Sequence, residues 1–208
     1  MQTTIPRTQL ILGGQKSGKS RFAETIAANW LGQSVEHEVL FIATAQAYDS
    51  EMRQRIERHQ LDRKRNLPQI KTLEEPLLLA TMLQKNSAPH RLLLIDCLTL
   101  WLSNYLTPHE NDADIDSQKR MTRYTAAHHD LLREIHSGVG PLVLVSNEIS
   151  QGVIPMGQET RQFVDQLGLL NQAVAKACER VTLIVAGCPI AIKGKLSLIH
   201  ISEPTRPY

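Results

Sequence analysis

Short apolar runs alternate along the chain with longer segments in which apolar residues recur every three or four positions. The runs predict buried strands and the longer segments predict helices. We expect strands at residues 8–12, 39–43, 70–73, 92–95, 142–145 and 181–186, and helices at 19–31, 50–65, 98–106, 117–136 and 158–179. A further leucine-rich helix is expected to open at Pro76, because proline is tolerated in the first helical turn.

This alternation predicts an α/β fold. Several of the strands are apolar on both faces, which is typical of a mainly parallel sheet covered by helices on both sides. With 208 residues the chain is long enough for one full core, and we expect a single domain over residues 1–195. Residues 196–208 have no periodicity and resemble the translated read-through of a cloning adapter, so we expect a non-native tail.

Composition and charge exclude several classes of protein. The chain has 23 Lys and Arg against 21 Asp and Glu, and its densest basic stretch, residues 53–65, is interleaved with acidic residues. We therefore expect no nucleic-acid partner. No apolar stretch approaches the roughly 20 residues that span a bilayer, so we expect no membrane insertion. Cys97, Cys178 and Cys188 form no paired motif, which predicts buried free thiols and a cytoplasmic protein.

One motif carries most of the chemistry. Its residues fit the pattern G-x-x-x-x-G-K-[ST] and are Gly13, Gly14, Gln15, Lys16, Ser17, Gly18, Lys19 and Ser20. The motif lies between a predicted strand and a predicted helix, where glycines let backbone N–H groups surround phosphate and the helix start adds a positive dipole. We expect Lys19 to reach the β- and γ-phosphate oxygens and Ser20 to offer a hydroxyl to Mg²⁺.

A carboxylate follows the apolar run at residues 92–95. Asp96 stands where ligands of open α/β sheets bind, at the carboxyl end of a strand. Together with the phosphate-binding motif it predicts a ligand of the metal or of the nucleoside. The alternative is a plain N-cap for the following helix.

His59 lies in the charged helix predicted at residues 50–65. Helical spacing puts it on one face with Met52 and Ile56. Two interpretations stay open: a histidine at the edge of the core, which the spacing alone favours, or a nucleophile or acid/base beside phosphate. We expect the adjacent His128 and His129 to lie on the surface.

A polar tripeptide follows the strand at residues 142–145. Ser146, Asn147 and Glu148 precede a glycine-bearing segment, residues 149–157, which we expect to be a mobile loop. The tripeptide is either part of a substrate loop or an ordinary connection to the next helix, and the sequence leaves both open.

Five blocks of sequence resemble the bifunctional adenosylcobinamide kinase / adenosylcobinamide-phosphate guanylyltransferase family of cobalamin biosynthesis. They are LILGGQKSGKSRFAE (10–24), FIATAQAYDSEMRQRIERH (41–59), LLIDCLTLWLSN (93–104), VSNEISQGVIP (145–155) and RQFVDQLGLLNQ (161–172). The resemblance covers nearly all of residues 8–193, and ordered blocks are far more specific than a phosphate-binding loop alone.

The resemblance implies a RecA-like P-loop NTPase fold, often assembled as a trimer, and two reactions. The first phosphorylates the aminopropanol hydroxyl of adenosylcobinamide, with GTP or ATP as donor. The second takes GMP from GTP onto a histidine and passes it to that phosphate, giving adenosylcobinamide-GDP.

The family's R-I-x-x-H pattern falls on His59, which the resemblance makes the histidine that accepts GMP. The same carry-over implies that the guanine nucleotide is lined by Ala43, Thr44, Ala45, Gln60, Leu61, Asp62, Arg63, Glu74 and Asp96. Two other classes remain as alternatives. One is a small-molecule kinase without nucleotidyl transfer, and the other is a RecA-like, nucleotide-gated ATPase.

Overall fold

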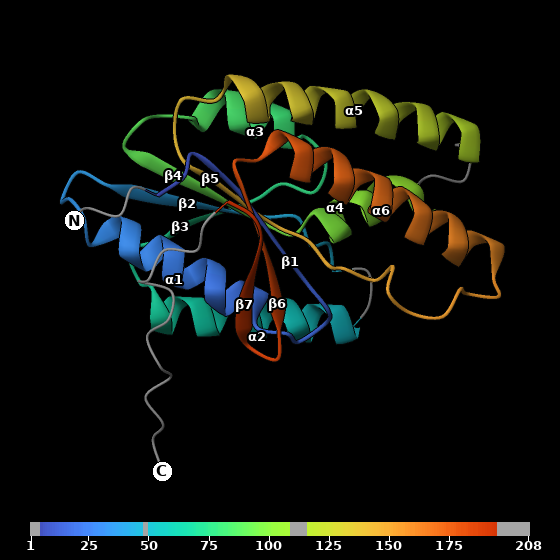
Figure 1. The fold of residues 1–208 in the computed structure, drawn as a ribbon, viewed down its shortest axis with the longest axis horizontal. Coiled ribbons are helices and arrows are strands. Elements are labelled where there is room, and N and C mark those ends of the chain that lie inside the picture. The colour runs from blue at the N-terminus through green and yellow to red at the C-terminus, as the bar shows by residue number, and fades with distance from the viewer. Residues whose placement is uncertain (1–4, 48–49, 109–115, 195–208) are drawn as a thin grey trace, which may run out of the picture.

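The computed structural model describes residues 5–47, 50–108 and 116–194, without the side chains of Met52, Arg55, His59, Asp62, Arg63, Lys64 and Asn66. This part forms one seven-stranded sheet with helices on both faces (Figure 1). Its elements are β1 (Thr8–Gly13), α1 (Lys19–Leu31), β2 (Glu38–Ala43), α2 (Ser50–Asn66), β3 (Lys71–Glu74), α3 (Leu79–Asn86), β4 (Arg91–Asp96), α4 (Leu98–Leu106), α5 (Ser117–Ser137), β5 (Leu142–Val145), α6 (Gln158–Ala177), β6 (Arg180–Val185) and β7 (Cys188–Lys193). The expected α/β class is confirmed.

The strands follow the order β3-β2-β4-β5-β1-β6-β7. All neighbouring pairs are parallel except β6 and β7, which pair antiparallel. One strand, β5, lies between β1, which leads into the phosphate-binding motif, and β4, which ends at Asp96. The carboxyl ends of these three strands therefore meet at one edge of the sheet.

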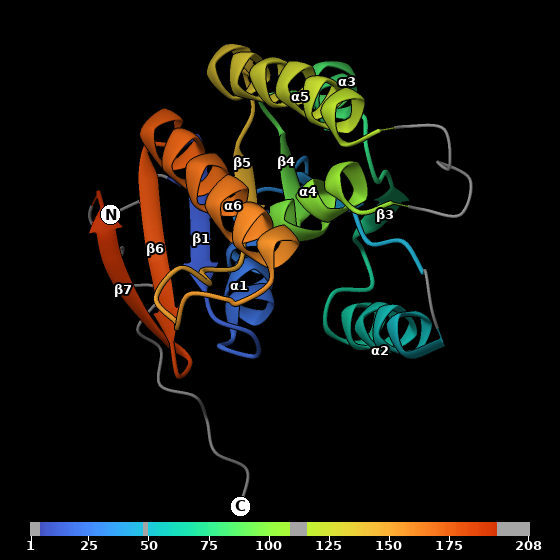
Figure 2. The same ribbon diagram turned by 90° about the vertical axis from the view of Figure 1, so that its right-hand side faces the viewer.

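Helices α3, α4, α5 and α6 cover one face of the sheet, and α1 and α2 lie on the other (Figures 1 and 2). Trp101, Leu131 and Leu170 are fully buried in the first layer. Ile26 of α1 packs with Val143 of β5 in the second. Because the strands bury apolar side chains on both faces, the apolar runs show no alternation in the sequence.

The prediction that Pro76 opens a helix is wrong, because α3 begins only at Leu79. The Glu75 carboxylate instead accepts hydrogen bonds from the N–H groups of Leu77 and Leu78, at 3.0 and 2.8 Å, and holds a turn there. The Leu77 carbonyl then accepts the indole N–H of Trp101 at 2.8 Å. These bonds make the segment a support for α4 rather than a helical turn.

The sequence prediction ended with the strand at residues 181–186 and missed β7. This edge strand contains Pro189, which is tolerated at an edge, and most of its residues are exposed, so it carries no apolar alternation. Ala186 and Gly187 connect it to β6 with positive φ angles of 51° and 80°, the conformations of a tight hairpin turn.

Two smaller expectations need correction. Cys97 and Cys178 are buried as expected, but Cys188 is exposed because it lies on β7 at the sheet edge. His129 is exposed as expected, whereas His128 is half-buried because it stacks on Tyr124, with ring centroids 5.6 Å apart.

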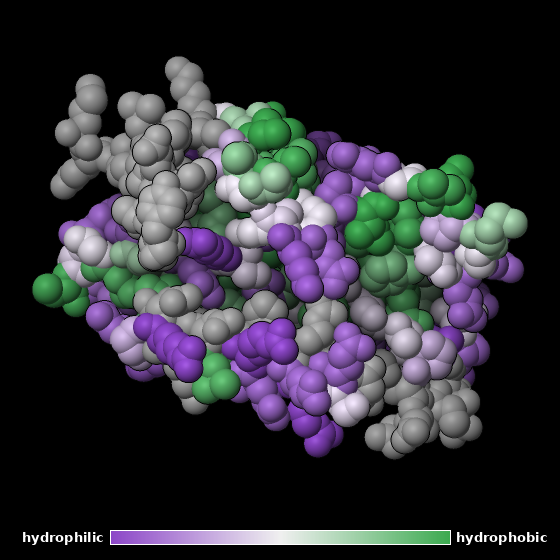
Figure 3. Space-filling view, turned by 90° about the horizontal axis from the view of Figure 1, so that it is seen from below, coloured by the Kyte–Doolittle hydropathy of each residue, from purple (hydrophilic) through white to green (hydrophobic). Residues whose placement is uncertain are grey.

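On the side of α1 and α2, the described surface is largely hydrophilic (Figure 3). Apolar side chains gather at the end where Figure 1 places the loop before α6, and Val153, Ile154 and Met156 of that loop are at least 77% exposed. Among the described helices, none is long and apolar enough to cross a membrane. The tail prediction for residues 196–208 concerns residues outside the described part and stays a prediction.

Candidate active site

The phosphate-binding motif forms a tight loop between β1 and α1. Ser17 N–H donates to the Gly14 carbonyl at 3.3 Å, and Lys16 and Gly18 take positive φ angles of 57° and 102°. Such changes of backbone hand turn successive N–H groups toward one point and make an anion site. Gly13 has no room for a side chain, because a Cβ there would lie 2.5 Å from the Ile184 carbonyl oxygen.

Lys19 is the first residue of α1 and is only 7% exposed. Its Nζ donates to the Gly14 carbonyl at 2.6 Å, so the ammonium group lies across the loop. Burial lowers the pKa of Lys19 from its ordinary value, and the nearby Asp96 carboxylate opposes this shift. A triphosphate would supply the counter-charge that this half-desolvated cation needs.

Ser20 and Asp96 meet beside the loop. The Ser20 hydroxyl donates to Asp96 Oδ2 at 2.9 Å, and both side chains are half-buried. Hydroxyl and carboxylate oxygens are ligands that Mg²⁺ prefers, with further positions left to phosphate and water. The pair expected from the sequence is therefore brought together.

Cys97 follows Asp96 but is closed off from the site. Its N–H donates to Thr44 Oγ1 at 2.9 Å, and that hydroxyl donates to the Cys97 carbonyl at 2.7 Å. Burial raises the pKa of the Cys97 thiol to about 12, so the thiol stays protonated. Thr44 is fully buried, and its side chain serves this backbone clamp.

The polar tripeptide after β5 lies between the phosphate-binding loop after β1 and Asp96 at the end of β4. Glu148 N–H donates to the carbonyl of Gly13 at 3.0 Å. Thr99 Oγ1 accepts from Asn147 N–H at 2.8 Å, and Asn171 Nδ2 donates to the Asn147 carbonyl at 3.0 Å. The backbone of this segment is thus fixed from the loop, from α4 and from α6.

Residues expected to line the nucleoside lie at the carboxyl ends of β2 and β3, farther from β1. Ala43 pairs in register with Asp96 on one side and Glu74 on the other. Gln60 Nε2 donates to Glu74 Oε1 at 3.0 Å and so joins α2 to the end of β3. Leu61 is 57% exposed, and Ala45 is half-buried after β2.

His59, Asp62 and Arg63 belong to α2, but their side chains lie outside the described part. Their roles, and the predicted apolar face shared by Met52, Ile56 and His59, stay predictions.

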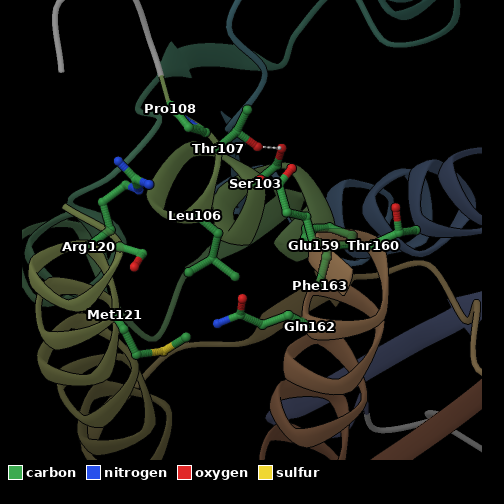
Figure 4. A pocket seen from close by; sticks show the side chains of 11 residues that line it. Ser103, Leu106, Thr107, Pro108, Arg120, Met121, Glu159, Thr160, Gln162 and Phe163 are labelled. Atoms are coloured by element: carbon green, nitrogen blue, oxygen red, sulfur yellow. Dashed lines mark hydrogen bonds between the residues drawn. The ribbon is translucent and has the colours of Figure 1, made fainter. Parts of the chain in front are cut away.

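A cavity of about 380 Å³ opens between the end of α4 and the starts of α5 and α6 (Figure 4). Leu106, Met121 and Phe163 give it apolar walls, while Gln162 and Arg120 bring polar groups. In Figure 2 the starts of α1 and α6 lie on the side that faces the viewer. The sequence analysis did not find this cavity, because its walls come from three separate helices.

The sequence analysis also missed the buried polar side chains that hold the strand ends. Asn104 Nδ2 donates to the carbonyls of Thr44 and Pro76, at 2.8 and 2.9 Å. Thr99 and Asn171 hold Asn147, as described above. Their signal was present as single polar residues in otherwise apolar helical segments, where a buried polar group needs a partner.

The loop, the buried lysine and the Ser20–Asp96 pair on a mainly parallel sheet define a P-loop nucleotide-binding protein. Residues 9–192 match the family model described as cobinamide kinase / cobinamide phosphate guanyltransferase. The chain belongs to this family, as the sequence resemblance indicated.

Two curated relatives span nearly the same length. A protein of Pseudomonas aeruginosa named bifunctional adenosylcobalamin biosynthesis protein CobP is 46% identical over 186 residues, which cover 89% of this chain and 97% of the relative. The protein of Escherichia coli named bifunctional adenosylcobalamin biosynthesis protein CobU is 34% identical over 191 residues, covering 88% and 98%.

A solved structure from Pyrococcus horikoshii OT3 is similar in fold. It superposes with a TM-score of 0.51 at 9% identity and covers 95% of this chain and 91% of that one. At this identity the likeness concerns the fold alone.

Proposed function

We propose that this enzyme phosphorylates the aminopropanol hydroxyl of adenosylcobinamide and then transfers GMP from GTP to the resulting phosphate, giving adenosylcobinamide-GDP and pyrophosphate. The observation that carries the proposal is the phosphate-binding loop with Lys19 across it and the Ser20–Asp96 pair beside it, in a chain of the cobinamide kinase / guanyltransferase family. GTP, or ATP in the first step, is the donor.

The two reactions demand attack at two phosphorus atoms. A kinase step attacks the γ-phosphorus, whereas nucleotidyl transfer attacks the α-phosphorus. A loop that holds the β- and γ-phosphates leaves both atoms open to nucleophiles from different sides. The charge on the leaving group in either step lies near Lys19, which stabilises it electrostatically.

We propose that Ser20 and Asp96 hold Mg²⁺. Their oxygens lie 2.9 Å apart in a half-buried position beside the loop, and this donor set fits a hard cation. The ion would neutralise charge on the phosphate oxygens. Asp96→Asn should therefore raise the Mg²⁺ concentration needed for half-maximal activity.

We propose that His59 carries GMP between the two substrates of the second step. A neutral imidazole attacks the α-phosphorus, the bond to pyrophosphate breaks, and the resulting phosphoramidate passes GMP to the corrinoid phosphate. Support comes from the family pattern on α2 and from the Gln60–Glu74 hydrogen bond, which holds this helix at the edge of the sheet.

GTP labelled in the α-phosphate should give an acid-labile adduct on the wild-type protein. His59→Ala should lose the adduct, while His136→Ala, an exposed histidine on α5, should keep it. An adduct of unchanged yield on His59→Ala would remove His59 from the mechanism.

We propose that the cavity between α4, α5 and α6 contacts the periphery of the corrinoid. Corrinoids carry amide side chains around a methyl-rich ring, and Gln162 and Leu106 offer matching polar and apolar contacts. Gln162→Trp, which fills the cavity, should raise KM for adenosylcobinamide about tenfold, as expected for the loss of roughly 1.4 kcal/mol of contacts. Gln84→Trp, at an exposed position of α3, is the control.

The whole proposal is tested by one incubation. The purified protein with adenosylcobinamide, GTP and Mg²⁺ should convert the corrinoid to products heavier by a phosphate and then by a further GMP. An unchanged corrinoid mass would refute the proposed function. We also propose a homotrimer on the family resemblance, which light scattering coupled to size exclusion can test.

A further inference from the structure

We propose that Glu148 is the general base of the kinase step and marks the place where the acceptor hydroxyl approaches the γ-phosphate. The inference rests on the proposed function and adds a catalytic residue to it. It assigns a role to a residue for which the sequence left two interpretations open, a substrate loop or an ordinary connection to the next helix.

The position of Glu148 is fixed by the phosphate-binding loop itself. Its N–H donates to the Gly13 carbonyl at 3.0 Å, directly where the loop begins. Ser146 N–H donates to the Ile11 carbonyl at 2.9 Å, so the segment continues the parallel pairing beyond β5. Because β5 lies between β1 and β4, Glu148 follows the strand that separates the loop from Asp96.

The surroundings keep this segment rigid. Thr99 and Asn171 hold the N–H and carbonyl of Asn147, the preceding residue, at 2.8 and 3.0 Å. A base on a fixed backbone can be placed accurately against a substrate proton, which general acid–base catalysis requires.

Other groups at these strand ends have different partners. Asp96 accepts from Ser20 and belongs to the proposed metal site. Lys19 is a cation, and Cys97 is buried behind its bonds to Thr44. The structure describes two carboxylates at the carboxyl ends of β1, β4 and β5, which are Asp96 and Glu148. Asp96 is bonded to Ser20, so Glu148 is the one that remains as a base.

Glu148 is half-buried as a residue, and one oxygen of its carboxylate is left for a substrate. Oε1 accepts from the N–H of Ser150 at 2.7 Å and also from the Ser150 hydroxyl. Within the described part of the chain, Oε2 has no hydrogen-bond partner. Ser150 thus orients the carboxylate and leaves an acceptor for the substrate.

The kinase step moves one proton and one phosphoryl group. Glu148 Oε2 takes the proton of the acceptor alcohol as the alcohol oxygen forms a bond to the γ-phosphorus. The bond between the γ-phosphorus and the β,γ-bridging oxygen breaks, and nucleoside diphosphate leaves with that electron pair. The proton passes from Glu148 to solvent after product release.

The rival explanation is that Glu148 only shapes the turn through Ser150. Glu148→Gln separates the two, because the amide keeps an oxygen to accept from Ser150 but cannot take a proton. Glu148→Asp keeps a base at a longer reach. Asp165→Asn removes an exposed carboxylate from α6 and controls for the loss of charge.

Two assays are run on each variant. The first follows γ-phosphate transfer to adenosylcobinamide, and the second follows GMP transfer from GTP to adenosylcobinamide phosphate supplied ready-made. Glu148→Gln should lower kcat of the first reaction about 100-fold or more, with KM for the donor unchanged, as for loss of a general base. It should leave the second reaction and the protein–GMP adduct intact, and Glu148→Asp should recover part of the kinase rate.

Kinase activity near the wild-type level in Glu148→Gln would overturn the inference and leave the proposed function standing. Equal loss of both reactions in a Glu148→Gln protein with an unchanged melting temperature would also overturn it, since Glu148 would then serve the shared phosphate site. Failure of the wild-type protein in both assays would instead refute the proposed function.

Discussion

At the scale of single residues, Lys19 combines two properties that conflict in the unliganded protein. Lys19 is 7% exposed and its Nζ donates to the Gly14 carbonyl, so its charge is largely removed from water. Burial lowers its pKa below the ordinary value of 10.5. The site therefore holds a charge that becomes favourable only when phosphate arrives.

Lys19→Met should separate stability from function. The variant should melt at a higher temperature than the wild type without nucleotide, because no desolvated charge remains, and should lose about 100-fold or more in both reactions. A lower melting temperature would contradict the account of Lys19.

The pH dependence of this effect has a definite sign. Since the folded-state pKa is lowered, the unfolded protein binds the Lys19 proton more tightly, and the protonated lysine destabilises the fold at neutral pH. The stability difference between Lys19→Met and the wild type should shrink as pH rises from the lowered pKa toward 10.5. Urea unfolding of both proteins across this alkaline range measures it.

At the scale of elements, the hairpin of β6 and β7 supports the phosphate-binding loop. The sequence analysis predicted the loop but missed β7. Gly187 N–H, at the tip between β6 and β7, donates to the Ser17 carbonyl at 2.9 Å. A Cβ on Gly18 would lie 3.4 Å from the Gly187 Cα. The outer strands thus brace the phosphate-binding loop from the side opposite β5.

Gly187→Ala should weaken nucleotide binding. Alanine at a φ of 80° costs roughly 1–2 kcal/mol, and relieving that strain moves the turn away from Ser17. Gly194→Ala has a similar φ of 77° but lies at the far end of β7, and its Cβ would lie 3.2 Å from the Glu179 carbonyl oxygen. It should cost at least as much stability and leave nucleotide affinity unchanged. Calorimetric titration with GTP compares them, and equal affinities would show that the hairpin does not brace the loop.

How far the sequence predicted these elements depended on the strength of the pattern. The strands that lead to the loop and to Asp96 contain apolar runs, and the loop has fixed motif spacing. The two strands, the helix after the loop and the roles of Ser20 and Asp96 as metal ligands were therefore predicted. Strand β7 has neither. The clamps made by Asn104, Asn171 and Thr99 join residues distant in sequence, and no local pattern reveals such partners.

At the scale of the whole molecule, the carboxyl ends of the strands bring together the residues to which we assign the two proposed reactions. β1 brings the loop, β4 brings Asp96, and β5 brings Glu148 between them, while α2 joins the edge through Gln60 and Glu74. The cavity that we propose for the corrinoid lies between α4, α5 and α6, on the other face of the sheet from α1 and α2. In the mechanism that we propose, this arrangement lets one triphosphate site serve acceptors from two sides.

A crystal structure with a non-hydrolysable GTP analogue and Mg²⁺ tests this account most directly. The β- and γ-phosphates should lie on the N–H groups of residues 14–19 with Lys19 Nζ against them, and a ring nitrogen of His59 should be able to approach the α-phosphorus within the assembled protein. Nucleotide bound away from this loop, or a His59 ring too remote to reach phosphorus in any arrangement of the subunits, would contradict it.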